Sequence, residues 1–282
     1  MDGLVVVDKE VGWTSHDVVA KLRGILQTRK VGHSGTLDPD ATGVLLVGVG
    51  RVTRLLRFLT VLPKTYTGEV VLGVSTSTLD ASGDVVATHD MRVTLDEVRA
   101  AAATLTGDIL QVPPMVSAIQ IDGKRLHELA RKGIEVERDA RPVTVHRFDV
   151  EATDDLLVYR IEVECSSGTY VRSLAADLGE ALGGGGHLRN LRRTAIGSFT
   201  LDEARRIDAV SNDAVLAPAF ALRDYPTVTA DVGLIANGKV LARADLGVEG
   251  DGPWAVVDED GRLLAMYESH RGDTVKPAVV VA

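Results

Sequence analysis

A short segment punctuated by glycines brings together side chains that could do chemistry. Residues 32–43 read Gly-His-Ser-Gly-Thr-Leu-Asp-Pro-Asp-Ala-Thr-Gly, so a histidine, a serine and two aspartates stand among turn-forming residues. Three interpretations compete: a turn without function, a nucleophilic serine, and an aspartate that acts as a base or a nucleophile. The serine interpretation is weak, because Thr36 replaces the final glycine of a Gly-x-Ser-x-Gly elbow and the segment precedes a strand instead of following one. A P-loop is excluded, since no Gly-Lys-Ser/Thr ending follows.

The aspartate interpretation fits the charge around this segment. From Lys21 to Lys64 the sequence has eight basic and two acidic residues, although the whole chain of 282 residues has a net charge of −9. From Leu201 to Ala282 fourteen acidic residues stand against eight basic ones. An aspartate near cations is ionised at pH 7, because its reference pKa is about 3.9 and the cations lower it. The basic excess is typical of a surface that faces phosphates, with a solvated, salt-bridged face as the alternative.

Arg172 is a second candidate. It follows Ser167-Gly168-Thr169-Tyr170-Val171 and falls near the first turn of a predicted helix that comes after a predicted strand. A guanidinium placed there could meet a carboxylate or a phosphate through two parallel hydrogen bonds. An ordinary surface arginine is the competing interpretation.

The sequence offers no metal or cofactor signature. Cys165 is the single cysteine, which excludes an internal disulfide and a cysteine-based zinc site. The seven histidines show no His-x-x-x-His spacing, and no Gly-x-Gly-x-x-Gly follows a predicted strand. We therefore expect no metal and no cofactor.

The elements that must position these residues form a mixed pattern of strands and helices. Strands are predicted at Leu4–Val7, Val44–Val49, Tyr66–Val74, Val143–Val150, Leu156–Cys165 and His187–Phe199. Helices are predicted after a cap at Thr14 or Ser15, over Arg51–Leu59, after a capping box at Thr94–Glu97, over Lys124–Lys132, and after a cap within Ser166–Thr169. Because strands and helices do not alternate regularly, the pattern favours an α+β fold with a mixed sheet.

Beyond residue 224 the pattern changes to short β-rich pieces separated by turns. This change predicts two domains, 1–224 and 225–282, the second small and β-rich. The apolar runs are far shorter than the roughly 18 residues that a membrane-spanning helix needs, and the sequence does not open with a signal peptide. We therefore expect a cytoplasmic protein without membrane contact. No patch for self-association is evident, so a monomer is expected.

Ordered motifs over residues 1–200 resemble one family. Residues 32–43 are similar to the catalytic motif of the TruB family, the bacterial pseudouridine synthases that modify the T-loop uridine of tRNA. Further segments resemble the same family in the same order: Asp8-Lys9 with Gly12-Trp13-Thr14-Ser15, Lys64-Thr65-Tyr66, Gln111-Val112-Pro113-Pro114 through Ser117-Ala118, Gly168 to Arg172, and Leu191-Arg192-Arg193.

The resemblance implies a role for each matching residue. It implies that Asp38 is the catalytic aspartate, that Tyr66 stacks on the target base and helps to remove its C5 proton, and that Arg172 orients Asp38. It implies that His33 lies beside the extruded nucleotide and that Leu191 lines the pocket. Lys9, Lys64 and Tyr170 are further expected substrate-binding residues within the matching motifs.

The implied partner is the T arm of tRNA, and the implied fold is a mixed-sheet catalytic core with a C-terminal RNA-binding module of the PUA type. Two departures concern fine specificity: Glu10 follows Lys9 where the family often has proline, and Val116 replaces an aromatic residue. The acidic C-terminal region resembles a PUA module only weakly. A non-catalytic RNA-binding protein and a hydrolase that releases uracil are the alternative functions.

Overall fold

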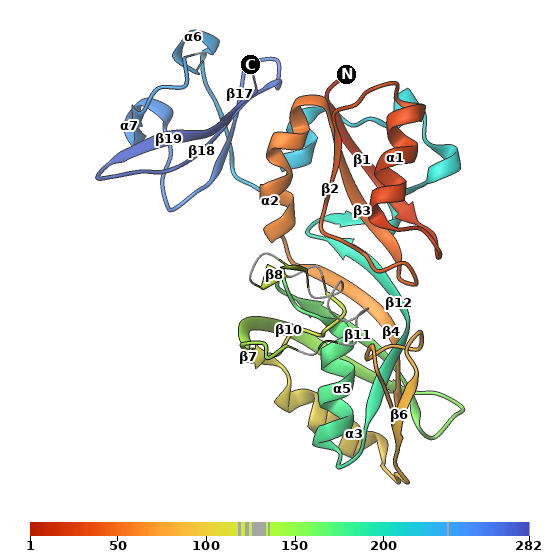
Figure 1. The fold of residues 1–282 in the computed structure, drawn as a ribbon. Coiled ribbons are helices and arrows are strands. Elements are labelled where there is room, and N and C mark those ends of the chain that lie inside the picture. The colour runs from red at the N-terminus through yellow and green to blue at the C-terminus, as the bar shows by residue number, and fades with distance from the viewer. Residues whose placement is uncertain (118–119, 122–123, 126–133, 135, 236, 282) are drawn as a thin grey trace. The chain divides into compact units, whose positions relative to one another are not determined.

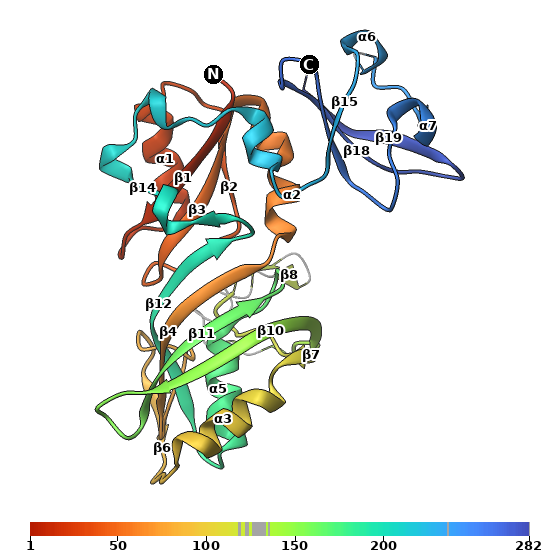
Figure 2. The ribbon, with the colours of Figure 1, turned by 180° about the vertical axis from the view of Figure 1, so that it is seen from behind.

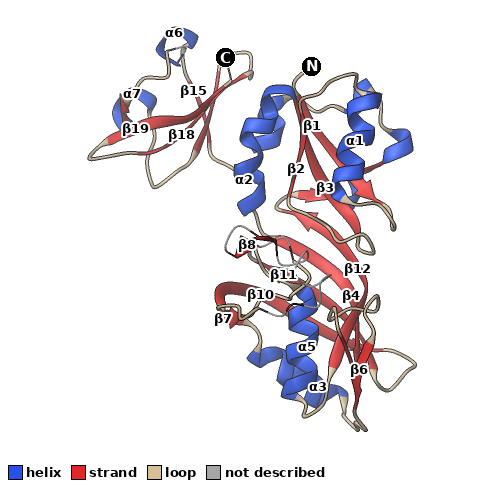
Figure 3. Cartoon of the chain, viewed as in Figure 1, coloured by secondary structure: helices blue, strands red, loops and turns tan. Residues whose placement is uncertain are grey.

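The computed structural model describes residues 1–117, 120–121, 124–125, 134, 136–235 and 237–281, and the chain forms two compact units. The first unit comprises Met1–Pro39, Gly43–Leu62 and Ala195–Ala282, and the second comprises Asp40–Thr42 and Pro63–Thr194. Both units combine strands with helices (Figure 1, Figure 3). The predicted α+β fold class is confirmed. None of the described helices is long and apolar enough to cross a membrane.

In the first unit, buried antiparallel strands carry the glycine-rich segment. β1 (Gly3–Lys9) pairs with β3 (Thr42–Val49), and β2 (Val31–Ser34) pairs with the same strand. α1 (Ser15–Ile25) begins after Thr14, one of the two predicted cap residues, and the Thr14 side chain forms a capping box with Asp17. Apolar residues of this helix pack on β1 and β3 in one buried cluster. The segment 32–43, predicted to be a loop throughout, begins as a strand because β3 offers backbone partners to His33 and Ser34.

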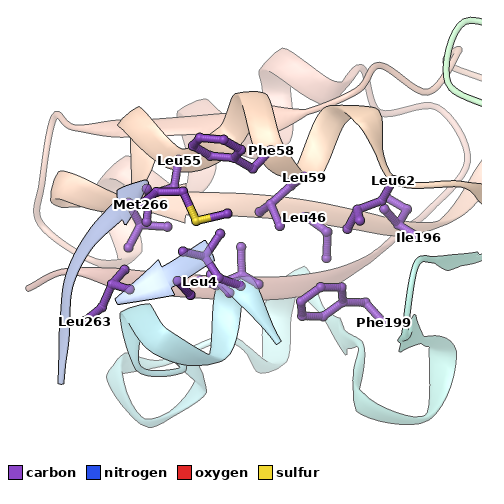
Figure 4. Packing of buried hydrophobic residues seen from close by; sticks show 14 of the residues in the cluster. Leu4, Leu46, Leu55, Phe58, Leu59, Leu62, Ile196, Phe199, Leu263 and Met266 are labelled. Atoms are coloured by element: carbon purple, nitrogen blue, oxygen red, sulfur yellow. The ribbon is translucent and has the colours of Figure 1, made fainter. Parts of the chain in front are cut away.

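A second cluster of the first unit joins the start of the sequence to its end. The predicted helix at 51–59 consists of a 3-10 helix, η1 (Gly50–Leu55), followed by α2 (Leu56–Val61). Figure 4 shows its apolar residues Leu55, Phe58 and Leu59 against Leu263 and Met266. The arginines of η1 also contact the end of the sequence: Arg51 donates to the carbonyl of Val281, and Arg54 donates to that of Val280 at 2.8 Å.

The C-terminal residues form a five-stranded sheet of their own. Its strand order is β15-β17-β18-β19-β16. One cluster around Trp254, Val256 and Tyr267 belongs to this sheet and its two short helices. Leu263 and Met266 belong instead to the cluster shared with Leu4 and Leu55. The five strands are Thr227–Thr229, Trp254–Val257, Leu263–Ser269, Thr274–Val280 and Leu241–Ala242, and the helices are α6 (Val232–Ile235) and α7 (Arg243–Leu246).

The second unit is built on the strand order β12-β4-β11-β10-β7. α3 (Leu95–Thr104) and α5 (Val171–Ala181) lie side by side and share one buried cluster with β4, β10 and β11 (Figure 2). The strands predicted at Val143–Val150 and Leu156–Cys165 are confirmed, and the structure pairs them antiparallel. The strands are β12 (Gly186–Ile196), β4 (Lys64–Leu72), β11 (Val158–Cys165), β10 (Arg141–Ala152) and β7 (Gly107–Gln111).

Short elements complete both units. Two small hairpins stand outside the main sheet of the second unit, β5 with β6 and β8 with β9. The helix predicted over Lys124–Lys132 is wrong at Lys124–Arg125, which form β9, and its other residues lie outside the described ones. The remaining bounds are β5 (Val74–Thr76), β6 (Val85–Thr88), β8 (Gln120–Ile121), β13 (Phe199–Thr200), η2 (Leu201–Glu203), β14 (Arg205–Arg206), η3 (Ile207–Ala209), η4 (Asn212–Ala214) and η5 (Pro218–Leu222).

Candidate active site

Asp38 stands in the turn between β2 and β3. Gly35 begins this turn with φ = 80°, a left-handed conformation that favours glycine. The Leu37 side chain is 4% exposed, so an apolar residue directly before Asp38 anchors the turn in the first unit. Asp38 itself is half-buried. The turn therefore presents a carboxylate from a backbone that is packed into the first unit.

The first residue of α1 and the segment before this helix hold both neighbours of Asp38 by hydrogen bonds. The Ser15 hydroxyl accepts from the Leu37 N–H at 2.9 Å and lies 3.3 Å from the Leu37 carbonyl oxygen, to which it donates. On the other side, the Gly12 N–H donates to the Pro39 carbonyl at 2.9 Å. The turn is thus fixed immediately before and immediately after the candidate aspartate.

Lys9 contributes to the same contacts. Its ammonium donates to the carbonyls of Trp13 at 2.7 Å, Glu10 at 3.1 Å and Pro39 at 3.2 Å. The residue is 1% exposed. A buried ammonium needs such acceptors, because an uncompensated charge in the interior is costly. In the first unit Lys9 is therefore a support of the turn, and its expected contact with substrate stays a prediction.

His33 lies in β2, four residues before Leu37, which anchors the turn. Its ring meets the ring of His16 edge to face, with centroids 5.3 Å apart and planes at 80°. His16 is exposed on the first turn of α1. Sequence reasoning did not single out His16, and it considered Ser15 only as a possible helix cap, a role that Thr14 takes. The contacts that identify both residues join positions about twenty residues apart.

In the second unit, the start of α5 carries Arg172. The residue is 4% exposed, and its two terminal nitrogens donate to different loops, Nη1 to the Thr78 carbonyl at 3.0 Å and Nη2 to the Val116 carbonyl at 2.8 Å. The Asp80 carboxylate lies 3.6 Å from Nη1. Arg172 is therefore a buried, partnered arginine and not an ordinary surface residue. Its expected contact with Asp38 stays a prediction.

The backbone of Tyr170 is held by a side chain from the edge strand β7. The Gln111 amide accepts from the Tyr170 N–H at 2.7 Å and donates to the Tyr170 carbonyl at 3.1 Å. Ser173 Oγ donates to the Val112 carbonyl at 3.1 Å. The cap expected within Ser166–Thr169 is wrong, since α5 starts after Tyr170 and has no side-chain cap of its own. Gln111 belongs to one of the motifs that resemble the TruB family, but its contact with the Tyr170 backbone becomes visible only in the structure.

Tyr66 and Leu191 lie at the border of the second unit's core. Tyr66 stands on β4 opposite Val163 of β11, and Leu191 lies on the neighbouring strand β12. Both side chains are partly buried and pack against the cluster that contains Val163 and Leu174. An aromatic ring at such a border keeps part of its surface available for stacking.

Lys64 begins β4 and is 6% exposed. Burial and, to a smaller extent, the positive charge of Arg193 together lower the pKa of its ammonium to about 8, while Cys165 acts in the opposite direction. Burial also raises the pKa of the Cys165 thiol to about 11. The expected contact of Lys64 with substrate stays a prediction.

The predicted residues thus fall into two sets. The first unit holds Lys9, His33 and Asp38, and the second holds Lys64, Tyr66, Tyr170, Arg172 and Leu191. Within the second unit a large groove of about 1160 Å³ lies over β4, β10 and β11, lined by charged residues such as Arg160 and Glu162. No residue of the predicted set lines this groove. Among the described residues, no three His, Cys, Asp or Glu side chains gather as a metal ion would require.

Comparisons with known proteins agree with this fold and these motifs. The profile of the TruB family pseudouridylate synthase N-terminal domain matches residues 23–171, and that of the tRNA pseudouridylate synthase B C-terminal domain matches residues 172–221. Proteins named tRNA pseudouridine synthase B are similar over nearly full length. The one from Streptomyces coelicolor is 48% identical, covering 99% of this chain and 97% of the relative, and the one from Mycobacteroides abscessus is 47% identical, covering 99% and 96%.

A solved structure shows the same architecture. The chain matched in the crystal structure of a Cbf5-Nop10-Gar1 complex is 25% identical to this one and has a TM-score of 0.76. The match covers 99% of this chain and 85% of that one. Fold and motifs together define a pseudouridine synthase, an isomerase. The chain belongs to the TruB family of these enzymes. The resemblance stated from the motifs is confirmed.

Proposed function

We propose that this protein isomerises the uridine at position 55 in the T loop of tRNA to pseudouridine, with Asp38 as the catalytic carboxylate. The observation that carries this proposal is the half-buried aspartate on a turn whose two flanks are fixed by hydrogen bonds, in a chain of the TruB family. The role fits the chemistry, because the reaction rearranges one nucleotide and needs no outside reagent.

The reaction breaks one bond and forms another between the same two rings. The target nucleotide must leave the loop's stack, since its C1′ and C5 atoms are hidden there, at a cost of a few kcal/mol. Asp38 starts the cleavage of the C1′–N1 bond by adding to C1′ or by taking the proton from C2′. The uracil rotates and rejoins through C5, N1 gains a proton, and C5 loses one to a base.

The second unit supplies the remaining roles in this proposal. Tyr66 stacks on the extruded base and helps to remove the C5 proton, and Arg172 orients the Asp38 carboxylate. Leu191 lines the base pocket, and Tyr170 and Lys64 contact the substrate. Two substrate-binding residues come from the first unit. His33 lies beside the extruded nucleotide, and Lys9 both supports the turn and contacts the substrate. These assignments follow the family motif residue by residue.

The partner in this proposal is the T arm of tRNA. The five-stranded C-terminal sheet acts as a PUA-like RNA-binding module that extends the contact beyond the catalytic residues. The protein works as a monomer in the cytoplasm, without a membrane or a protein partner.

The test is the variant Asp38→Asn, with Asp40→Asn as its matched control, because Asp40 is an exposed aspartate two residues further along the same turn. Both proteins are incubated with an unmodified T-arm hairpin, and pseudouridine is detected by its reaction with carbodiimide. We expect Asp38→Asn to form no pseudouridine and to bind the hairpin within about tenfold of the wild type, since removing a negative charge near phosphates costs little affinity. Asp40→Asn is expected to keep its activity.

Three results would contradict the proposal. Isomerisation at the wild-type rate by Asp38→Asn would remove the assignment of the catalytic carboxylate. Release of free uracil by the wild-type protein would identify a hydrolase, and binding without any product would identify a pure RNA-binding protein.

A further inference from the structure

The structure assigns Ser15 as a positioning residue that holds the Asp38 turn in its reactive geometry; this inference rests on the proposed function. Ser15 is the first residue of α1 and is 1% exposed. Its hydroxyl uses both of its hydrogen-bonding capacities on the residue before Asp38, the Leu37 N–H at 2.9 Å and the Leu37 carbonyl at 3.3 Å.

The helix itself does not need this hydroxyl. Serine near a helix start usually caps a free backbone N–H. In α1 that task is already done by Thr14, whose hydroxyl accepts from the Asp17 N–H at 3.0 Å while the Asp17 carboxylate accepts from the Thr14 N–H at 2.9 Å. The Ser15 hydroxyl is therefore directed at the turn, and its hydrogen bonds serve residue 37.

Hydrogen bonds also fix the residue after Asp38, so the turn is held on both sides of the aspartate, and we call this arrangement the bracket. The Gly12 N–H and the Lys9 ammonium both donate to the Pro39 carbonyl, at 2.9 and 3.2 Å. Gly12 has φ = 82°, so its backbone is in a conformation that other residues adopt only with strain. With Leu37 and Pro39 both fixed, the position of the Cα atom of Asp38 is fixed as well.

Such a bracket matters for rate more than for binding. A reacting group that shifts by about 1 Å from its productive position can cost roughly a hundredfold in rate. Binding of the hairpin depends mainly on phosphate contacts, which the turn's geometry alters little. Loss of the Ser15 hydroxyl should therefore lower kcat and leave KM and Kd nearly unchanged.

The experiment compares Ser15→Ala with Thr153→Val in the full-length protein. Thr153 lies in the turn after β10, and its hydroxyl likewise donates to a carbonyl, that of Val158 at 2.8 Å, and accepts from an N–H, that of Asp155 at 3.2 Å. We measure kcat, KM and Kd with the T-arm hairpin, and hydrogen exchange of the segment 33–42 by mass spectrometry. We expect Ser15→Ala to lose at least about tenfold in kcat, with KM and Kd within about threefold, and to exchange this segment faster. Thr153→Val should match the wild type in all of these.

Several outcomes would overturn the inference. An unchanged kcat in a folded Ser15→Ala protein would do so, whether or not exchange becomes faster, and so would a loss confined to Kd. If Ser15→Ala does not fold, Ser15→Cys keeps the side-chain volume with a weaker hydrogen bond, and its kcat decides in the same way. Asp38→Asn is measured in parallel: an inactive Asp38→Asn beside a fully active Ser15→Ala refutes the role of Ser15 alone, whereas an active Asp38→Asn refutes the proposed function.

Discussion

Arg172 shows how a side chain can be defined by two carbonyls that lie far apart in the sequence. Its terminal nitrogens connect the Thr78 and Val116 carbonyls, and Asp80 adds a carboxylate at 3.6 Å. A planar guanidinium can serve both acceptors at once because its donors point in fixed, divergent directions. The residue thereby ties the start of α5 to two loops of the second unit.

We predict that Arg172→Lys lowers activity strongly. A single ammonium cannot reproduce the planar fork, so one of the two loops loses its donor, and the expected fall in kcat/KM on the T-arm hairpin is roughly a hundredfold. Arg160→Lys is the matched control, because Arg160 is an exposed arginine on β11 of the same unit. Full activity of Arg172→Lys would show that Arg172 is peripheral to the reaction.

A second residue-scale prediction concerns the pH dependence of stability. Lys64 has a pKa of about 8 in the folded state and an ordinary value of 10.5. Between these values the unfolded chain binds more protons than the folded one, so this group makes the protein more stable as the pH rises. Cys165 acts in the opposite direction above about pH 9, because its pKa is raised from 9.0 to about 11. The clearest window is therefore pH 8 to 9.

Within that window Lys64 should contribute a gain of about 1 kcal/mol to the free energy of unfolding. The measurement is urea unfolding at pH 8 and at pH 9 for the wild type, Lys64→Met and Lys21→Met, where Lys21 is an exposed lysine of α1. The gain should disappear in Lys64→Met and persist in Lys21→Met. An equal gain in all three proteins would exclude Lys64 as its source.

At the scale of the elements, a side chain from the strand β7 holds the residue that precedes α5. Gln111 at the end of β7 is 2% exposed and pairs with both backbone groups of Tyr170. This pairing takes the place of the side-chain cap that α5 lacks. The edge strand β7 therefore helps to define where the helix that carries Arg172 starts.

Gln111→Glu should destabilise the protein, because the carboxylate keeps an acceptor for the Tyr170 N–H but faces the Tyr170 carbonyl without a donor. The expected loss is about 1–3 kcal/mol, the usual effect of leaving a buried polar group unsatisfied. Thermal unfolding of this variant and of Glu180→Gln, a change at an exposed position of α5, checks the prediction. Equal stability of the two variants would contradict it.

The caps also show which features could be predicted from sequence. The predicted cap at Thr14 and the predicted capping box at Thr94–Glu97 are confirmed, and each depends on residues only three positions apart. The cap of α5 could not be predicted, because Gln111 and Tyr170 are 59 positions apart. The strand character of His33 and Ser34 likewise depends on β3, a partner that the composition of the glycine-rich segment does not reveal.

The basic excess between Lys21 and Lys64 likewise includes cations whose partners lie far away in the sequence. The excess predicts either a surface that faces phosphates or a solvated, salt-bridged face. In the structure Arg51 and Arg54 donate to the carbonyls of Val281 and Val280, and the Arg57 guanidinium lies 3.9 Å from the Glu268 carboxylate. Lys64 is buried. Counts of charge predict a local potential but not which cations the fold itself uses. For the site, the motif predicted the candidate residues, whereas their supports at Ser15 and Gln111 required the structure.

At the scale of the whole molecule, the first unit has a core that spans almost the full length of the sequence. Met266 and Leu263 share a buried cluster with Leu4 and Leu55, while Leu264 on the same strand packs in the cluster that belongs to the C-terminal sheet. The predicted boundary after residue 224 stays a prediction. Because the shared cluster contains residues from before and after this boundary, substitutions in it can test whether the two parts of the sequence unfold independently.

Met266→Ala should weaken β1 as well as the C-terminal sheet. Truncating a fully buried methionine typically costs about 2–5 kcal/mol, and here the cavity opens beside residues from both ends of the sequence. Native-state hydrogen exchange is expected to rise in Gly3–Lys9 for Met266→Ala. Leu264→Ala should raise exchange in the C-terminal strands and leave Gly3–Lys9 protected. Unchanged exchange of β1 in Met266→Ala would mean that the two regions are energetically separate.

The shared cluster also sets an order of events during translation. The ribosome releases Leu4 and Leu55 long before Leu263, Met266 and Val279, the residues that complete their packing. In a nascent chain that ends before these late residues, the apolar side chains of β1 and α2 that belong to this cluster are exposed to water. The buried cluster around Leu4 and Leu55 can therefore be completed only after Val279 has been synthesised.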